Sequence, residues 1–187
     1  MPRWESGSAE RLTRIAMELF AEKGFEETSV VEIAKRARVT TRTFFRYFPD
    51  KREVLFAESD GLRAALVERI RQAPDDEPLA VVLGALAGFD WDTLGREAQR
   101  QRHAVIAANP ELLERDLSKQ NDIAVAFTDA LQQRGVDAAV ARLTSRVGLQ
   151  VFGVAYERWL SAGDADLAGI VAETMALLSR TASARAG

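Results

Sequence analysis

Residues 29–51 read SVVEIAKRARVTTRTFFRYFPDK, a pattern that predicts two short helices joined by a tight turn. Ser29 and Glu32 have the spacing of a capping box, so the first helix is expected to start at Ser29. The turn falls at residues 38–39, and Thr40 is expected to cap the second helix. The segment is therefore a candidate helix–turn–helix.

Positive charge is concentrated in this segment. Residues 35–52 carry seven Lys or Arg and one acidic residue, whereas the whole chain of 187 residues has a net charge of −3. Local positive charge on a helix–turn–helix favours a DNA-binding surface, because it is the local charge that meets phosphate. A solvated basic face is the alternative, because runs of charge are usually plain surface.

The two helices are expected to have an inner apolar face. One helix must enter the major groove while the other crosses the backbone, and apolar contacts must hold that crossing angle. The inner positions are Ile33, Ala34, Ala37, Val39, Phe44 and Phe48, and the first helix is also expected to bury Val31.

The outer face is expected to read DNA. Thr41, Arg42 and Arg46 can reach base edges, and Arg can bind guanine bidentately. Thr43, Tyr47 and Lys51 lie where they could hold phosphates, and the helix N-terminus at residues 28–29 offers backbone N–H groups to another phosphate. The residues predicted to contact DNA are Thr28, Ser29, Arg38, Thr40, Thr41, Arg42, Thr43, Phe45, Arg46, Tyr47 and Lys51.

The rest of the chain also has helical periodicity, with no convincing alternation of the kind that marks a strand. Further helices are predicted at residues 9–23, 51–72, 79–88, 94–108, 111–134, 137–161 and 165–180. The expected fold is all-α, with a three-helix helix–turn–helix head at residues 1–50 and a helical bundle at residues 51–187.

Composition argues against several classes of function. The chain has no Cys and a single His, His103, so thiol catalysis, disulfides and a His-based metal centre are not expected. It lacks a glycine-rich phosphate loop, and we expect neither catalytic residues nor a cofactor. Without a membrane-length apolar run or a secretory signal, a cytoplasmic location is expected.

The quoted residues closely resemble the TetR family of bacterial transcriptional regulators. The resemblance rests on Gly24-Phe25, SVVEIA at residues 29–34, VTTRTFFRYF at residues 39–48 and Lys51, and it covers about residues 9–56. It implies a homodimeric, ligand-responsive repressor that binds a DNA operator, and two-fold symmetry leads us to expect a palindromic operator. The head would bind DNA, and residues 51–187 would bind the effector and form the dimer.

The chain departs from the family pattern within the helix–turn–helix. Arg38 stands where Gly is usual, so the turn residue must accept a left-handed conformation or the turn has another shape. Phe45 replaces a common Tyr, Tyr47 a common His, and Arg42 a Gly. The operator sequence therefore does not follow from the resemblance.

The body is expected to hold a small apolar or acyl-type effector. Candidate ligand contacts are Leu86, Phe89, Trp91, His103, Ile106, Phe127, Val151, Phe152 and Tyr156. The part of the chain from Arg96 to residues 157–164 is similar to a subgroup of actinobacterial TetR-type regulators that includes the mycofactocin-system regulator, which implies acyl-CoA-like ligands. The last two helices would pair across the dimer. An activator, or a ligand-free DNA-binding protein of the same fold, is the alternative.

Overall fold

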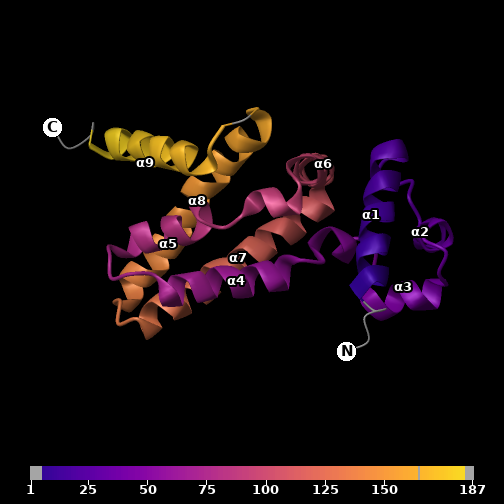
Figure 1. Cartoon of the computed structure of the whole chain (residues 1–187), viewed down its shortest axis with the longest axis horizontal. Helices are drawn as coiled ribbons and strands as arrows, with labels where there is room; N and C mark the ends of the chain where they lie inside the picture. The colour runs from indigo at the N-terminus through magenta and orange to yellow at the C-terminus, as the bar shows by residue number, and fades with distance from the viewer. Residues whose placement is uncertain (1–5, 164, 184–187) are drawn as a thin grey trace. The chain divides into compact units, whose positions relative to one another are not determined.

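The computed structural model describes residues 6–163 and 165–183, and over these ranges the chain is all-α, as predicted (Figure 1). The helices are α1 (Ser6–Lys23), α2 (Val30–Arg36), α3 (Thr41–Tyr47), α4 (Ser59–Gln72), α5 (Pro78–Ala87), α6 (Arg96–Ala107), α7 (Pro110–Gln133), α8 (Ala138–Ser161) and α9 (Leu167–Ser183), with 3₁₀ helices η1 (Glu53–Phe56) and η2 (Trp91–Leu94). Within the described part of the chain, none of these helices is long and apolar enough to cross a membrane.

The chain divides into two compact units, and each has its own core. The head unit comprises Met1–Asp60 and Ala98–Asp116, and the body unit comprises Gly61–Glu97 and Leu117–Gly187. The helices α6 and α7 therefore each contribute residues to both units. A functional division into residues 1–50 for DNA and 51–187 for ligand and dimer remains a prediction.

The head core is built from the apolar faces of α1, α2 and α3, together with buried residues of η1, α6 and α7. Phe44, Ile33 and Leu12 are completely buried in it, and Phe48 is almost so. The predicted inner face is confirmed, with Val39 half-buried at the turn. Val31 was wrongly expected inside: its side chain is 63% exposed, because α2 is turned so that Ile33 and Ala34 face the core.

The predicted helix at residues 51–72 is interrupted. The chain forms η1 first, and α4 begins only at Ser59. The Asp50 carboxylate accepts the backbone N–H groups of Arg52 and Glu53, which starts the short 3₁₀ turn. Residues 54–56 are apolar and all buried, and three successive residues of a regular α-helix cannot share one narrow face.

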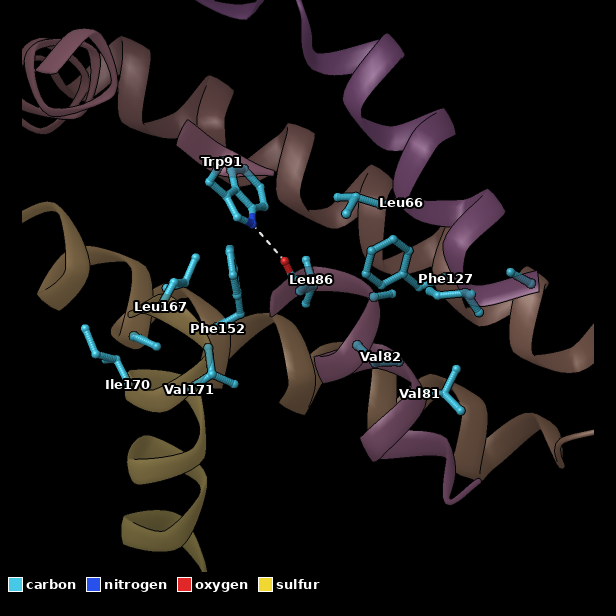
Figure 2. Packing of buried hydrophobic residues seen from close by; sticks show 14 of the residues in the cluster. Leu66, Val81, Val82, Leu86, Trp91, Phe127, Phe152, Leu167, Ile170 and Val171 are labelled. Atoms are coloured by element: carbon cyan, nitrogen blue, oxygen red, sulfur yellow. Dashed lines mark hydrogen bonds between the residues drawn. The ribbon is translucent and has the colours of Figure 1, made fainter. Parts of the chain in front are cut away.

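The body core gathers side chains from α4, α5, α7, α8 and α9 (Figure 2). Phe127, Leu86 and Trp159 are among its most deeply buried members. The indole N–H of Trp91 donates to the carbonyl of Leu86 at 2.7 Å, so this buried polar group is satisfied.

Gly148 allows α8 to approach α5 closely. A Cβ added at Gly148 would lie 2.5 Å from Cγ1 and 3.3 Å from Cβ of the buried Val82. Gly153 lies on the same helix, and a Cβ added there would meet no heavy atom within 4 Å. Substitution of each glycine by Ala therefore adds the same methyl group to α8, and only the one at Gly148 would meet Val82.

Gly148→Ala is expected to lower the free energy of unfolding by about 1–3 kcal/mol through overpacking against Val82. Gly153→Ala is expected to raise it by about 0.5–1 kcal/mol, because Ala favours the helix over Gly. Urea denaturation of both variants measures the difference. If both substitutions changed the free energy of unfolding equally, α5 and α8 would not be packed as described.

Candidate nucleic-acid interface

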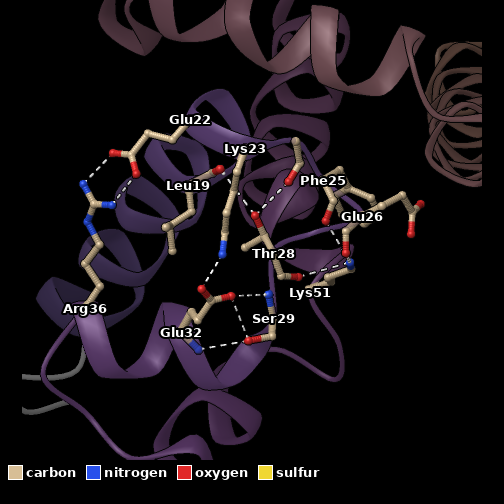
Figure 3. Close-up of polar contacts among 11 residues, drawn as sticks. Leu19, Glu22, Lys23, Phe25, Glu26, Thr28, Ser29, Glu32, Arg36 and Lys51 are labelled. Carbon is tan, nitrogen blue, oxygen red and sulfur yellow. Dashed lines mark hydrogen bonds and ion pairs between the residues drawn. The ribbon is translucent and has the colours of Figure 1, made fainter.

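The N-terminus of α2 is fixed by the predicted capping box (Figure 3). The Glu32 backbone N–H donates to Ser29 Oγ at 3.2 Å, and the Ser29 backbone N–H donates to Glu32 Oε2 at 3.1 Å. The Glu32 carboxylate also pairs with the ammonium of Lys23. The hydrogen bond from Lys23, followed by those from Ser29, lowers the pKa of Glu32 to about 2, so the capping carboxylate is ionised at neutral pH.

The turn after α2 is a Schellman motif. The Val39 N–H donates to the Ala34 carbonyl at 2.9 Å, and the Arg38 N–H donates to the Lys35 carbonyl at 3.1 Å. Arg38 has a φ of 56°, so of the two outcomes expected for this turn the structure shows the left-handed residue. The backbone therefore keeps the usual turn although its residue is Arg.

The inward face of α3 determines what its outward face presents. Thr40 caps the helix by accepting the Thr43 N–H at 3.1 Å. Phe44 and Phe48 face the core at positions i and i+4, which turns Arg42 and Arg46 to the opposite side of the helix. This outward side is free to meet a ligand.

Most of the predicted DNA contacts lie on the surface of the head unit. Ser29, Arg38, Thr40, Thr41, Arg42, Phe45 and Arg46 are exposed, whereas Thr43, Tyr47 and Lys51 are half-buried. The ring of Phe45 is 55% exposed. Arg46 donates to the Tyr47 hydroxyl at 2.7 Å and stacks on its ring, whereas no described residue forms a hydrogen bond or ion pair with Arg42. The guanidinium of Arg42, at the start of α3, therefore keeps its donors available for a partner outside the described residues.

Thr28 differs from the other predicted contacts because its side chain is only 1% exposed. Its hydroxyl donates to the carbonyls of Gly24 at 2.8 Å and Leu19 at 3.3 Å (Figure 3). Its N–H donates to the carbonyl of Phe25. Since both donors are used within the protein, we leave Thr28 out of the proposed interface.

Lys51 is held by the loop between α1 and α2. Its ammonium donates to the carbonyls of Phe25 at 2.8 Å, Glu26 at 3.2 Å and Thr28 at 3.2 Å (Figure 3). It also lies 4.3 Å from the centroid of the Phe25 ring. An ammonium group has three N–H donors, and the three carbonyls engage them. Lys51 therefore positions the start of α2, and its geometry does not favour a phosphate contact.

Comparison with known proteins agrees with this geometry. The family model described as "Bacterial regulatory proteins, tetR family" matches residues 12–57, which include α2, the turn and α3. This part of the chain therefore belongs to the TetR family. No group of His, Asp and Glu in the described ranges could hold a metal ion.

The relatives that the chain matches are transcriptional regulators, not enzymes. The HTH-type regulator TcmR of Streptomyces glaucescens is 38% identical over 77 residues, which are 41% of this chain and 34% of TcmR. MftR of Mycobacterium tuberculosis, named for mycofactocin biosynthesis, is 28% identical over 168 residues, 84% of this chain and 82% of MftR. The TetR-family repressor FadR of Thermus thermophilus, solved with lauroyl-CoA, is 27% identical, with 91% of this chain and 92% of FadR covered and a TM-score of 0.57.

The predicted effector contacts fall into two groups. The structure brings together Leu86, Phe89, Trp91, Phe127, Phe152 and Tyr156 in the body core, and Val151 is buried on α8. His103 and Ile106 belong to the head unit instead, where Ile106 is part of the core and His103 is exposed. Trp159 is missing from the predicted set, although its spacing from Phe152 and Tyr156 places it on the same face of α8.

Arg42→Ala is expected to lose discrimination at particular base pairs by about 1–3 kcal/mol while leaving protein stability unchanged. Binding to a duplex selected from random DNA, and to its single-base-pair variants, measures this. Lys35→Ala removes an exposed cation from α2 and should leave the discrimination between these duplexes unchanged. Uniform weakening by Arg42→Ala would contradict a base-reading role.

Lys51→Met is expected to lower the free energy of unfolding by about 1–3 kcal/mol, because it leaves three loop carbonyls without their donor. The dependence of DNA affinity on salt should keep its wild-type slope, because no phosphate contact is lost. Denaturation and DNA binding at several salt concentrations test this pair of results. A slope reduced by about one per protomer with unchanged stability would instead make Lys51 a phosphate contact.

Proposed function

We propose that this TetR-family protein is a homodimeric repressor, acting in the cytoplasm, that releases a palindromic operator when a small acyl-type effector binds. The observation that carries the proposal is the outward face of α3, on which Arg42 is exposed and uncommitted while Phe44 is completely buried behind it. Such a helix can enter the major groove without disturbing the core that holds it.

The exposed residues at the start of α2 and on the outward face of α3 have side chains or backbone groups that suit contacts with DNA. Arg42 and Arg46 can donate to guanine, and the ring of Phe45 can contact a thymine methyl group. Ser29 lies at the start of α2, where backbone N–H groups favour a phosphate. Thr41 stands beside Arg42 in the first turn of α3.

The last two helices carry the residues that suit a dimer interface. Leu143 and Val154 on α8 are 64% and 52% exposed, and Leu177 on α9 is 51% exposed. Large apolar side chains on adjoining helices are stabilised when a second chain covers them. Because α8 and α9 pack together in the body unit, a two-fold pairing would form a four-helix contact.

An aromatic series in the body core supports the proposed effector site. The rings of Phe89, Trp91, Phe152, Tyr156 and Trp159 form successive contacts with centroids 5.0–5.5 Å apart. The guanidinium of Arg96 lies 4.1 Å from the Trp159 ring centroid, at one end of this series. An acyl chain would have to part these rings, and its anionic end would take the place of the exposed Asp92 carboxylate, which lies 3.5 Å from Arg96. The lauroyl-CoA complex of the Thermus thermophilus relative adds support for an acyl-type ligand.

The two helices that contribute to both units offer a route from effector to DNA. In the head unit, Arg102 of α6 donates to the Leu55 carbonyl at 2.6 Å, and Arg115 of α7 donates to Glu53 at 2.6 Å. Both acceptors lie in η1, which follows α3 in the chain. A displacement of α6 or α7 by the effector would therefore act on η1 and change the placement of α3, which couples the two binding events.

Lauroyl-CoA at about one hundred times its Kd is expected to stabilise the protein by about 2.7 kcal/mol, which raises Tm by several degrees. It should also weaken binding to a duplex selected from random DNA, because the coupling is reciprocal. Differential scanning fluorimetry and gel shift measure the two effects.

Titrations with free CoA and with free laurate separate the contributions of the CoA group and the acyl chain to these two effects. No Tm shift at saturating lauroyl-CoA would contradict an acyl-CoA effector. A Tm shift accompanied by tighter DNA binding would favour an activator or co-repressor, and selected DNA that binds without any response to acyl-CoA would favour the ligand-free alternative.

A further inference from the structure

A surface hollow of about 410 Å³ lies in the head unit between α1 and the turn that precedes α3. Its lining residues are Arg11, Arg14, Ile15, Arg36, Ala37 and Arg38. We call it the arginine hollow. With four guanidinium groups around two apolar residues, its chemistry suits an anion.

Two of the four arginines are already neutralised by α1. Arg36 donates through both terminal nitrogens to Glu22, each at 2.6 Å (Figure 3), and Arg14 donates to Glu18 at 2.6 Å. Neither Glu18 nor Glu22 lines the hollow. The hollow therefore keeps an excess of positive charge from its other two arginines.

The remaining two arginines, Arg11 and Arg38, have guanidinium N–H groups without an acceptor among the described residues. Arg11 donates its Nε–H to the Ala37 carbonyl at 3.1 Å, a bond that also holds the C-terminus of α2 against α1. Its terminal nitrogens, and the whole guanidinium of Arg38, form no hydrogen bond or ion pair with any residue that the structure describes. Each guanidinium group has five N–H donors, which suit the oxygens of an anion. Most of these donors on Arg11 and Arg38 have no acceptor among the described residues.

The backbone of Arg38 points to a use for its side chain. Arg38 is the one non-glycine residue with positive φ in residues 6–163 and 165–183. The Schellman turn would accept Gly there without steric cost. An Arg that adopts this conformation, and whose guanidinium has no hydrogen bond or ion pair with the described residues, is best explained by a partner outside the protein.

We propose that the arginine hollow binds a phosphodiester group of the DNA backbone beside the bases that α3 reads. The proposal rests on the proposed DNA-binding function and extends its interface from α3 to α1. Arg38 lines the hollow and precedes the α3 cap, Thr40, by two residues, so one side of the hollow lies next to the end of α3 that carries Arg42. Guanidinium groups bind phosphate oxygens in a bidentate manner, and such contacts fix register without reading sequence.

Arg38→Gly separates this role from a structural one. Gly removes the side chain and relieves the left-handed backbone, so Tm should equal or exceed that of the wild type. DNA affinity at low salt should fall about tenfold, and the slope of log affinity against log salt should decrease by about one per protomer. The probe is a duplex selected from random DNA, and a duplex of unrelated sequence should show the same loss.

Lys35→Gln is the matched control, because Lys35 is an exposed cation on α2 that does not line the hollow. It should leave the salt slope close to that of the wild type. If Arg38→Gly and Lys35→Gln change the slope equally, the arginine hollow has no phosphate of its own and the inference is overturned. If the wild type binds no DNA at low salt, the proposed function fails instead.

Calorimetric titration of the DNA-free protein with sodium pyrophosphate distinguishes the DNA backbone from a free phosphate compound. The inference expects pyrophosphate to compete only weakly with DNA. Tight pyrophosphate binding that Arg38→Gly abolishes, together with an unchanged DNA salt slope, would assign the hollow to a soluble phosphate ligand and overturn the proposal.

Discussion

The burial of Phe44 sets the orientation of α3, and the function of the head follows from that orientation. Phe44 is fully excluded from water, and its ring lies 5.5 Å from that of Phe48, one helical turn later. A large apolar side chain in such a position contributes several kcal/mol when it is buried, roughly 3–5 kcal/mol by the loss that truncation to Ala causes. With these two rings inside, Arg42 and Arg46 must face outward.

The residues around α3 support this orientation from both sides. The Schellman turn and the Thr40 cap place the first turn of the helix, while Lys51 binds the loop that leads into α2. None of these contacts uses the outward side chains of α3. Replacement of Arg42 or Phe45 should therefore alter the face that α3 presents with little effect on the fold.

The sequence predicts those features that depend on near neighbours. The capping box at Ser29 and the cap at Thr40 are local, and both are found, whereas the sequence leaves two conformations open for Arg38 and the structure shows the left-handed one. The roles of Thr28 and Lys51 depend on carbonyl groups of other segments, which no spacing reveals. For the same reason the pattern does not show that α6 contributes Ile106 to the head core, or that residues 54–56 are buried together and interrupt the predicted helix.

The central claim is that the outward face of α3 contacts DNA, and photocrosslinking tests it most directly. p-Benzoylphenylalanine can replace Phe45, whose ring is 55% exposed, or Leu143 of α8, which is 64% exposed. On irradiation with a duplex selected from random DNA, position 45 should crosslink to the DNA and position 143 should not. Crosslinking from position 143 with none from position 45 would contradict the account.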